Sequence, residues 1–265
     1  MIKFTKITAV AILAYCASIA SFAWGKNADL QNGFVYVHTS RNMPELIIEG
    51  KKDALKTNVL HSAKNLEIDC GEKQIAFLIL SNRTVIQLEE NTKIKIKSFS
   101  QTPPFSFDFY SETEETRSIL DMEILRGKIR VYGVRPRATS SINVESPFGK
   151  YDVKSTKFTM SVSDKHTEIV LFEGQSTFTS KNGKRDFIQN KQRGEILAER
   201  LNSEYPMKIE YLTSIEEDAL LLKYNDCKTV FNSVEFFKGK DGKMRAIRIT
   251  PKEFLNRSAK YEYRK

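Results

Sequence analysis

The stretch "NVESPFGKYDVKSTKFTMSVSDKHTEIVLFEGQ", residues 143–175, decides the fold. Apolar and polar residues alternate on both sides of two turn signals, Ser146-Pro147-Phe148-Gly149 and Glu173-Gly174. Pro at the second position and Gly at the fourth suit a type I turn. Alternation with a period of two is typical of half-buried β-strands. Nothing in the stretch resembles a catalytic set, so it predicts strands and turns of a β-domain.

The same pattern extends outward from this stretch, from Phe34 to about Ala198. Short alternating runs such as "FVYVHT", "ELIIEG" and "KIKIKSF" are separated by turn residues, as in a sandwich or barrel. "KNGK" (181–184) is an Asn-Gly hairpin signal, and Gly127 within a strand pattern indicates a bulge or a close backbone approach. The polar run "SETEETRS" (111–118) predicts an exposed loop. We predict a mostly β fold, an antiparallel β-sandwich or jelly-roll-like domain over 34–198.

Three elements in order carry a family resemblance: "LRGKIRV" (125–131), "SPFGKYDVKSTKF" (146–158) and "IVLFEGQSTF" (169–178). Over about 54–198 the chain resembles the FecR-domain family, the extracytoplasmic domain of ferric citrate regulator-like proteins. Its members typically show an apolar-x-Gly turn, then a Pro-x-Gly turn before a Val-Arg-Gly-Thr-x-Phe strand, then an apolar strand ending in Glu-Gly. Lys154 and Ser155 replace the Arg-Gly pair here. The matching positions, which would serve turns and core, are Leu125, Gly127, Val131, Pro147, Gly149, Val153, Thr156, Phe158, Glu173 and Gly174.

The N-terminus reads as a targeting segment. Lys3 and Lys6 precede the uncharged run 7–24, and small residues suit cleavage after Ala23, so 1–23 is predicted to be a secretory signal peptide. An uncleaved inner-membrane anchor made by residues 7–24 is the alternative, and a lipoprotein acylated at Cys16 is a third. Each reading places the remainder outside the cytoplasm, in the periplasm or secreted.

Two cysteines remain after cleavage, Cys70 and Cys227. In an oxidising compartment they allow one intramolecular disulfide. Two buried free thiols are the other reading. The sequence leaves both open.

The segment 199–265 reads as a short α+β extension. "MKIEYL" (207–212) is expected to be a strand, and Ser214 with Glu217 fits a capping box that opens a helix over about 215–227. "VEFFKGKDGKMRAIRIT" (234–250) predicts a hairpin that turns at Asp241-Gly242.

The positive charge lies in the end of this extension. The chain has a net charge of +9; its last 28 residues hold ten basic and three acidic side chains, and 24–237 is neutral. Such a field favours an anionic surface, either envelope lipid headgroups, acidic polysaccharide or an acidic protein; a solvated tail is the plainer reading. The candidate anion-binding residues are Lys238, Lys240, Lys243, Arg245, Arg248 and Lys252.

Signatures of catalysis and of metal binding are absent from the sequence. His38, His61 and His166 lack metal-ligand spacing, and no phosphate-binding or nucleophile motif occurs. The paired acids at 89–90 and 114–115 point to opposite faces of a strand and cannot flank one bond. The alternating Phe105, Phe107 and Phe109 serve either as core or as a platform for a sugar. We therefore predict no enzyme, no metal and no cofactor.

The resemblance implies non-enzymatic signalling. Classical relatives span the inner membrane, hold a sigma factor through a cytoplasmic segment and contact an outer-membrane receptor. Only residues 1–6 would be cytoplasmic here, so we expect an envelope protein as partner, without direct sigma-factor contact and without nucleic acid. Binding of acidic polysaccharide or envelope lipid through the basic C-terminal region is the alternative function.

Overall fold

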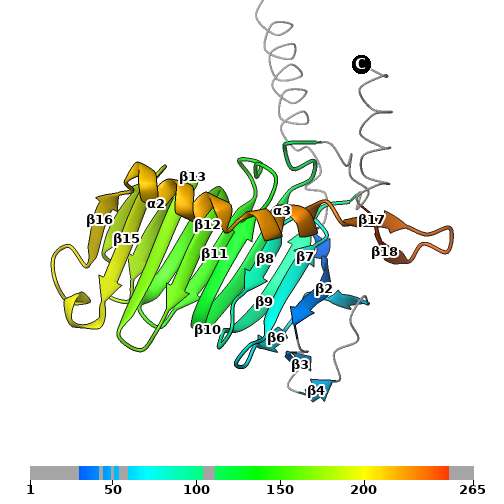
Figure 1. The fold of residues 1–265 in the computed structure, drawn as a ribbon, viewed down its shortest axis with the longest axis horizontal. Helices are drawn as coiled ribbons and strands as arrows, with labels where there is room; N and C mark the ends of the chain where they lie inside the picture. Colours follow the sequence, from blue (N-terminus) through cyan, green and yellow to red (C-terminus); the bar gives the residue numbers. More distant parts are fainter. Residues whose placement is uncertain (1–29, 42–43, 49–50, 54–58, 104–110, 251–265) are drawn as a thin grey trace, which may run out of the picture.

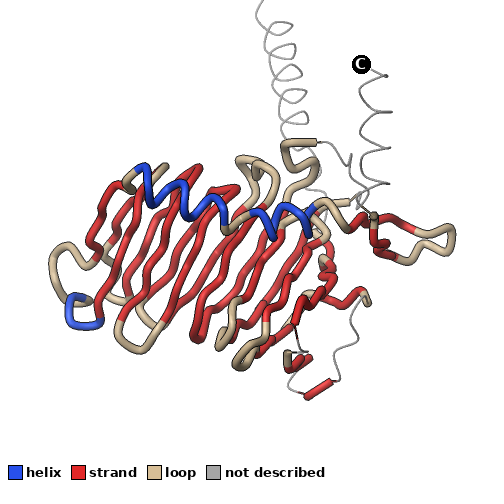
Figure 2. Tube along the Cα trace, in the orientation of Figure 1, coloured by secondary structure: helices blue, strands red, loops and turns tan. Residues whose placement is uncertain are grey.

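The computed structural model describes residues 30–41, 44–48, 51–53, 59–103 and 111–250. Most of them form β-strands, and almost all strand pairs are antiparallel. The predicted mostly β, sandwich-like fold is confirmed (Figures 1 and 2). The targeting segment, Phe105, Phe107, Phe109 and Lys252 lie outside the described residues.

Strand pairing arranges the chain in two sheets that share three long strands. Those shared strands are β10 (Ser118–Tyr132), β12 (Gly149–Val162) and β13 (His166–Ser180). The first sheet contains one half of each, together with β5 (Leu60–Ser62), β2 (Phe34–Arg41), β7 (Ile75–Leu80), β8 (Val85–Leu88), β15 (Gln192–Leu197) and β16 (Met207–Tyr211). The second contains the other halves with β4 (Lys51–Asp53), β3 (Glu45–Ile48), β6 (Leu66–Asp69), β9 (Lys93–Gln101), β1 (Gln31–Asn32), β11 (Ser141–Ser146) and β14 (Arg185–Gln189).

Each shared strand changes partners midway along its length. The first part of β10 pairs with β9 and, in parallel, with β11, whereas its last residues pair with β8 and β12. Likewise, β13 pairs first with β15 and then with β14. Register irregularities mark the change in both β10 and β12. The three strands therefore bend from one sheet into the other.

The bend also changes which residues point inward. In β10 the buried apolar positions are Leu120, Met122 and Ile124 before the bend, but Ile129 and Val131 after it. Strand side chains alternate strictly between faces, so the shift from even to odd numbers requires an irregularity of the kind a bulge supplies. The shift keeps both halves of the strand facing one core.

That core lies between the two sheets. It contains buried residues of both, among them the fully buried aromatic side chains Phe99, Tyr151, Phe158 and Phe178. The outer face of the first sheet is covered by α2 (Ser214–Leu222), α3 (Asn225–Phe231) and the hairpin of β17 (Val234–Lys238) and β18 (Met244–Arg248). Figure 1 shows the two helices running across the strands, with the hairpin beyond α3. A short 3₁₀ turn, Ala198–Arg200, follows β15.

The predicted turn at Glu173-Gly174 is wrong. β13 runs without interruption from His166 to Ser180, and Gly174 sits at its bend. The hairpins predicted at Asn182-Gly183 and at Asp241-Gly242 are confirmed, and both glycines have a positive φ.

The predicted single helix is two helices, and its capping box begins one residue earlier than expected. The Thr213 side chain accepts from the Glu216 backbone N–H, and the Glu216 side chain accepts from the Thr213 N–H. The first helix, α2, ends before Tyr224, and the buried hydroxyl of Tyr224 lies 2.9 Å from Thr159 Oγ1. This hydrogen bond between Tyr224 and Thr159 holds the start of α3 against the sheet.

The loop over 111–118 contains buried groups that its polar sequence did not predict. Glu114 and Thr116 are buried. Glu114 accepts hydrogen bonds from the Asn82 side chain (3.1 Å) and from the Arg137 backbone N–H (3.3 Å). Charge-assisted hydrogen bonds of this kind offset the cost of removing a carboxylate from water.

Cys70 and Cys227, the two cysteines among the described residues, are free thiols. Cys70 belongs to the core between the sheets, whereas Cys227 belongs to α3 and its buried thiol faces the first sheet, 3.2 Å from Gln87 Oε1. Burial raises the pKa of each thiol to about 12. The disulfide that the sequence left open is therefore not formed in this structure.

Candidate functional site

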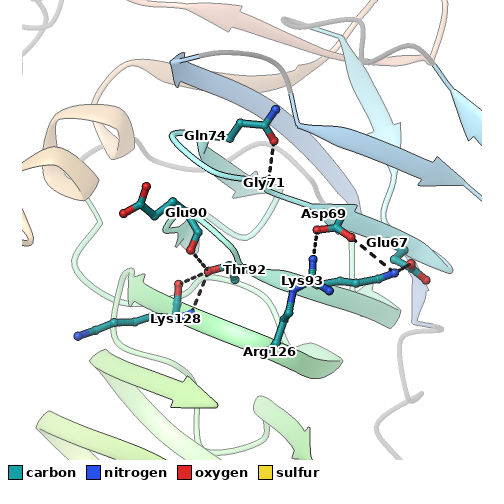
Figure 3. Close-up of polar contacts among 9 residues, drawn as sticks. All are labelled: Glu67, Asp69, Gly71, Gln74, Glu90, Thr92, Lys93, Arg126 and Lys128. Atoms are coloured by element: carbon teal, nitrogen blue, oxygen red, sulfur yellow. Dashed lines mark hydrogen bonds and ion pairs between the residues drawn. The ribbon is translucent and has the colours of Figure 1, made fainter. Parts of the chain in front are cut away.

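The bend of β10 is centred on Gly127. Its φ is +90°, and a Cβ there would overlap the Thr92 backbone and lie 2.8 Å from Asn91 O. The Thr92 hydroxyl accepts from the Lys128 N–H (2.9 Å) and donates to Lys128 O (3.1 Å), as Figure 3 shows. This single hydroxyl satisfies both backbone groups of Lys128 at the irregularity. The close approach predicted at Gly127 is confirmed.

Ion pairs lie beside this bend on the outer face of the second sheet (Figure 3). Asp69 pairs with Arg126 (2.6 Å) and Lys93 (3.7 Å), and Lys93 also pairs with Glu67 (2.7 Å). The hydrogen bond that Lys93 donates to Glu67 is the main cause that raises the pKa of Lys93. Each charge has a partner on another strand of the second sheet, and the Arg126–Asp69 pair spans β9, so this cluster stabilises the sheet and presents no reactive group.

The bends of β12 and β13 contact each other. Gly174 has a φ of +92°, and a Cβ there would overlap the Lys154 carbonyl oxygen. The Ser155 hydroxyl donates to the Glu173 carbonyl and accepts from the Lys157 N–H (3.1 Å). A serine at this motif position therefore bridges the two bends directly.

The other motif positions also serve the fold. Val131, Val153 and Phe158 are buried in the core. A Cβ at Gly149 would lie 2.5 Å from Thr179 O. Leu125, one of the positions that the resemblance assigns to turns and core, is 38% exposed and lies at the register shift between Ile124 and Arg126.

The remaining two described motif side chains lie on the surface. Pro147 is exposed in the turn between β11 and β12, and Glu173 is exposed and pairs with Lys157 (2.9 Å). These positions build turns, bends and core, and they do not converge on one space.

A groove of about 530 Å³ lies beside the bends. Its lining residues, unlike the motif positions, converge on one space. Its aromatic floor is an edge-to-face pair, Tyr132 and Phe231, with ring centroids 5.3 Å apart. The lining residues come from the turn before β8, the loop that follows position 110, the end of β10, the bends and α3. They are Arg83, Ser111, Glu112, Thr113, Tyr132, Gly133, Val134, Arg135, Lys157, Glu173, Lys228, Phe231 and Asn232.

Positive charge predominates in the groove. The Arg83 guanidinium lies 4.4 Å from the centre of the Phe231 ring and donates to Ser111 O (3.3 Å). The Lys157 ammonium lies 5.9 Å from the Tyr132 ring centre. Arg135 and Lys228 are exposed, so four basic side chains face two acidic ones, Glu112 and Glu173.

The groove is suited to binding. Burial raises the pKa of Tyr132, so its phenol stays protonated and able to donate a hydrogen bond. Cations over aromatic rings form a surface that attracts acidic and aromatic groups. Among the described residues no cluster of His, Cys, Asp and Glu is arranged to hold a metal ion.

Sequence reasoning missed this groove. Arg83, Arg135, Lys157 and Lys228 belong to four separate stretches, and no local spacing links them. In the structure Arg83 is a non-glycine residue with a φ of +68° that lies in a tight turn and is nonetheless buried, and these are properties that the sequence does not display.

The predicted anion-binding residues lie elsewhere, on the β17–β18 hairpin. Lys238, Lys240 and Lys243 are exposed around its tip, whereas Arg245 pairs with Asp241 (3.0 Å). Arg248 lies near enough to His38 that, after burial, its charge is the second cause lowering the pKa of that imidazole. The hairpin groups these charges at one end of the molecule (Figure 1).

Comparison with protein families matches residues 67–175 to the model described as FecR protein. This segment is similar to the FecR family. It includes the bends of β10, β12 and β13, which accounts for the glycines that the motifs share. This match supports a signalling or regulatory role for the chain.

Two solved structures are similar over part of the chain. Both are crystal structures titled "putative anti-sigma factor" from Parabacteroides distasonis ATCC 8503, at 1.65 Å and 2.50 Å. Each is 10% identical, with a TM-score of 0.40, and the match covers 69% of this chain and 99% of that one. No curated protein matched in the corresponding sequence comparison. Within the described part of the chain, no helix has the length and apolar character needed to cross a membrane.

Proposed function

We propose that this protein is a non-enzymatic signalling module of the bacterial cell envelope that binds a protein partner outside the cytoplasm. The observation that carries the proposal is the match to the FecR family, in which motif positions such as Gly127, Gly174 and Phe158 serve the bends and the core. The residues that recognise the partner therefore lie on the surface of the protein.

The groove is the surface best suited to binding a protein partner. It combines an aromatic floor with exposed cations, and it lies where the bends fix the backbone most closely. Binding surfaces gain affinity when they are rigid before the partner arrives. A partner segment that carries acidic and aromatic side chains would match it.

The experiment is cross-linking in cells followed by isolation of the complex. Lys228→Glu and Arg135→Glu reverse charges in the groove without touching the core. Lys223→Glu makes the same charge change on an exposed residue outside the groove and serves as the matched control.

We expect one envelope protein to be recovered with the wild type and with Lys223→Glu, and to be lost with the groove variants. Recovery that is equal for all variants would exclude the groove as the docking site. Recovery of a sigma factor as the direct partner would contradict the proposed place of action.

The place of action has its own measurement. Mass spectrometry of the N-terminus from fractionated cells would give a chain beginning at Trp24 for a cleaved signal, or an intact N-terminus in the inner membrane for an anchor. A chain found in the cytoplasm with its N-terminus intact would overturn the proposal.

Binding of an anionic envelope surface is the second candidate function. It is favoured by the exposed Lys238, Lys240 and Lys243 around the hairpin tip. Since Val234 and Phe236 of the same hairpin are buried, truncation would damage the fold, and replacing these lysines by Glu is the cleaner change. In co-sedimentation with anionic vesicles at low and high salt, the variant with all three lysines replaced would then lose the salt-sensitive part of the binding. Equal binding by the triple variant would remove this candidate.

A further inference from the structure

The first sheet ends in an open edge at β16. This strand pairs with β15 on one side, and none of the other described strands pairs with it. Figure 1 shows it at the end of the sheet opposite the β17–β18 hairpin. An unpaired edge exposes backbone donors and acceptors and is a ready template for another strand.

The direction of these backbone groups follows from one hydrogen bond. The Leu212 N–H donates to Lys191 O (2.9 Å), next to the ladder in which Tyr211 faces Gln192. In antiparallel pairs, hydrogen-bonded and non-hydrogen-bonded positions alternate. Lys208 and Glu210 therefore bond to β15, and Ile209 and Tyr211 direct their N–H and C=O groups outward. The Met207 N–H also points outward, and Asp186 Oδ2 accepts it (3.2 Å).

This end of the molecule is also unusually apolar. Among the described residues, seven of the ten exposed large hydrophobic side chains lie between positions 187 and 222. Tyr211 is 71% exposed, and Ile209 is 38% exposed. Exposed apolar groups gathered at a strand edge mark an interaction surface.

The edge strand is self-complementary. Its sequence is Met207-Lys208-Ile209-Glu210-Tyr211, and Lys208 and Glu210 are about half exposed on one face. If two copies pair antiparallel about Ile209, Lys208 of each faces Glu210 of the other. Shifting the centre to Glu210 would instead place two carboxylates opposite each other, and shifting it to Lys208 would oppose two ammonium groups. Like charges directly opposite are destabilising, so charge selects the Ile209 register.

That register also satisfies the outward backbone groups. The two Ile209 residues would exchange both N–H···O bonds, and each Tyr211 N–H would donate to Met207 O of the second copy, while Asp186 keeps the Met207 N–H. The Tyr211 ring would lie opposite Met207. We propose that two copies of this chain associate through β16, which joins their first sheets into one continuous sheet with a two-fold axis at Ile209.

The first test measures the mass of the purified protein, in the form in which cells process it, by light scattering over a wide range of concentration. We expect a monomer–dimer equilibrium. Lys208→Glu and Glu210→Lys should each raise the dimer dissociation constant about tenfold or more, because each creates two like-charge pairs. Lys181→Glu, an exposed residue in the neighbouring hairpin, is the matched control and should leave the constant unchanged.

Two combinations make the register itself testable. Mixing Lys208→Glu with Glu210→Lys should restore association as a heterodimer, and the double variant carrying both changes should associate like the wild type. A wild type that remains monomeric throughout, or single variants that associate as the wild type does, would overturn the proposal.

A backbone variant tests the edge independently of charge. Because the Ile209 N–H points away from β15, Ile209→Pro removes a donor that the monomer does not use. It should keep the thermal melting of the monomer while abolishing the dimer. A dimer that persists in Ile209→Pro would show that another surface joins the two copies. If instead the melting temperature falls together with association, the assigned direction of the Ile209 N–H is wrong and the proposal falls with it.

Discussion

The outer faces of the two sheets are covered in different ways. On the first sheet, buried apolar residues such as Phe77 and Ile79 pack under Val230 and Phe236 of the C-terminal elements. The second sheet faces outward with paired charges, for example Lys97 between Glu123 (3.3 Å) and Glu145 (2.7 Å). Apolar packing against the C-terminal extension therefore covers the outer face of the first sheet, whereas ion pairs among the described residues lie on that of the second.

The shared strands show how one chain supplies both faces. Before its bend, β10 directs Asp121 and Glu123 outward, and after the bend it directs Arg130 and Tyr132 toward the covering helices. The phase change at Gly127 therefore separates two outward surfaces as well as keeping one core. The difference between the two outer faces is therefore encoded within single strands. Substitutions at the bend, at the covering hairpin and at the ion pairs test how much each contributes to stability.

The largest expected effect is at a bend. Gly174→Ala should lower the free energy of unfolding by about 3–5 kcal/mol, since its Cβ would overlap the Lys154 carbonyl and its φ is unfavourable for any other residue. Gly183→Ala is the matched control: its φ is +78°, but no atom lies within 4 Å of the added Cβ. It should cost about 1–2 kcal/mol. Equal costs in chemical denaturation would show that backbone strain alone, without close approach, explains Gly174.

A somewhat smaller effect is expected at the cover of the first sheet. Phe236→Ala removes a buried ring from the contact between the hairpin and the sheet and should cost about 3 kcal/mol. Phe237→Ala changes the half-buried residue that follows, on the other face of the strand, and should cost clearly less. If the Phe236 variant melts like the wild type, the hairpin is an appendage and the first sheet does not depend on its cover.

The smallest effect is expected at the ion pairs of the open face. Hydrogen bonds from Lys97 and then Lys150 lower the pKa of Glu145. A carboxyl with a lowered folded pKa stabilises the protein fully above its ordinary pKa of about 4 and loses that contribution as the pH falls through the lower folded value.

Glu145→Gln should therefore flatten the loss of stability on acidification below about pH 5. The change should stay under about 1 kcal/mol, because the pair is one-third exposed and screened by water. Unfolding curves at a series of pH values provide the measurement. A variant whose acid limb is as steep as that of the wild type would show that these ion pairs do not couple to folding.

Local chemistry made most of the fold predictable. Alternation with a period of two gave the strands, and Asn182-Gly183 and Asp241-Gly242 gave hairpins, because these signals act between neighbouring residues. The misreading at Gly174 has a physical cause: a glycine with positive φ serves a turn and a strand bend equally. Only the carbonyl of Lys154, twenty residues earlier, distinguishes the two.

The errors at the helix and at the groove have different origins. Thr213 with Glu216 and Ser214 with Glu217 satisfy the same capping-box spacing, so the sequence cannot choose between them. The groove brings together Arg83, Lys157 and Lys228, whose proximity depends on the bends and on the packing of α3. Tertiary contacts of this kind leave no local pattern.

The sharing of β10, β12 and β13 between the sheets has a consequence for how the molecule opens. A sandwich of two separate sheets can lose one while the other persists, but here neither sheet keeps its central strands if the other unfolds. Native-state amide hydrogen exchange reports such units of opening. Amides in the two halves of β10, such as those of Met122 and Val131, should therefore exchange through one common opening event. Those of β16, at the open edge of the first sheet, should exchange earlier and independently.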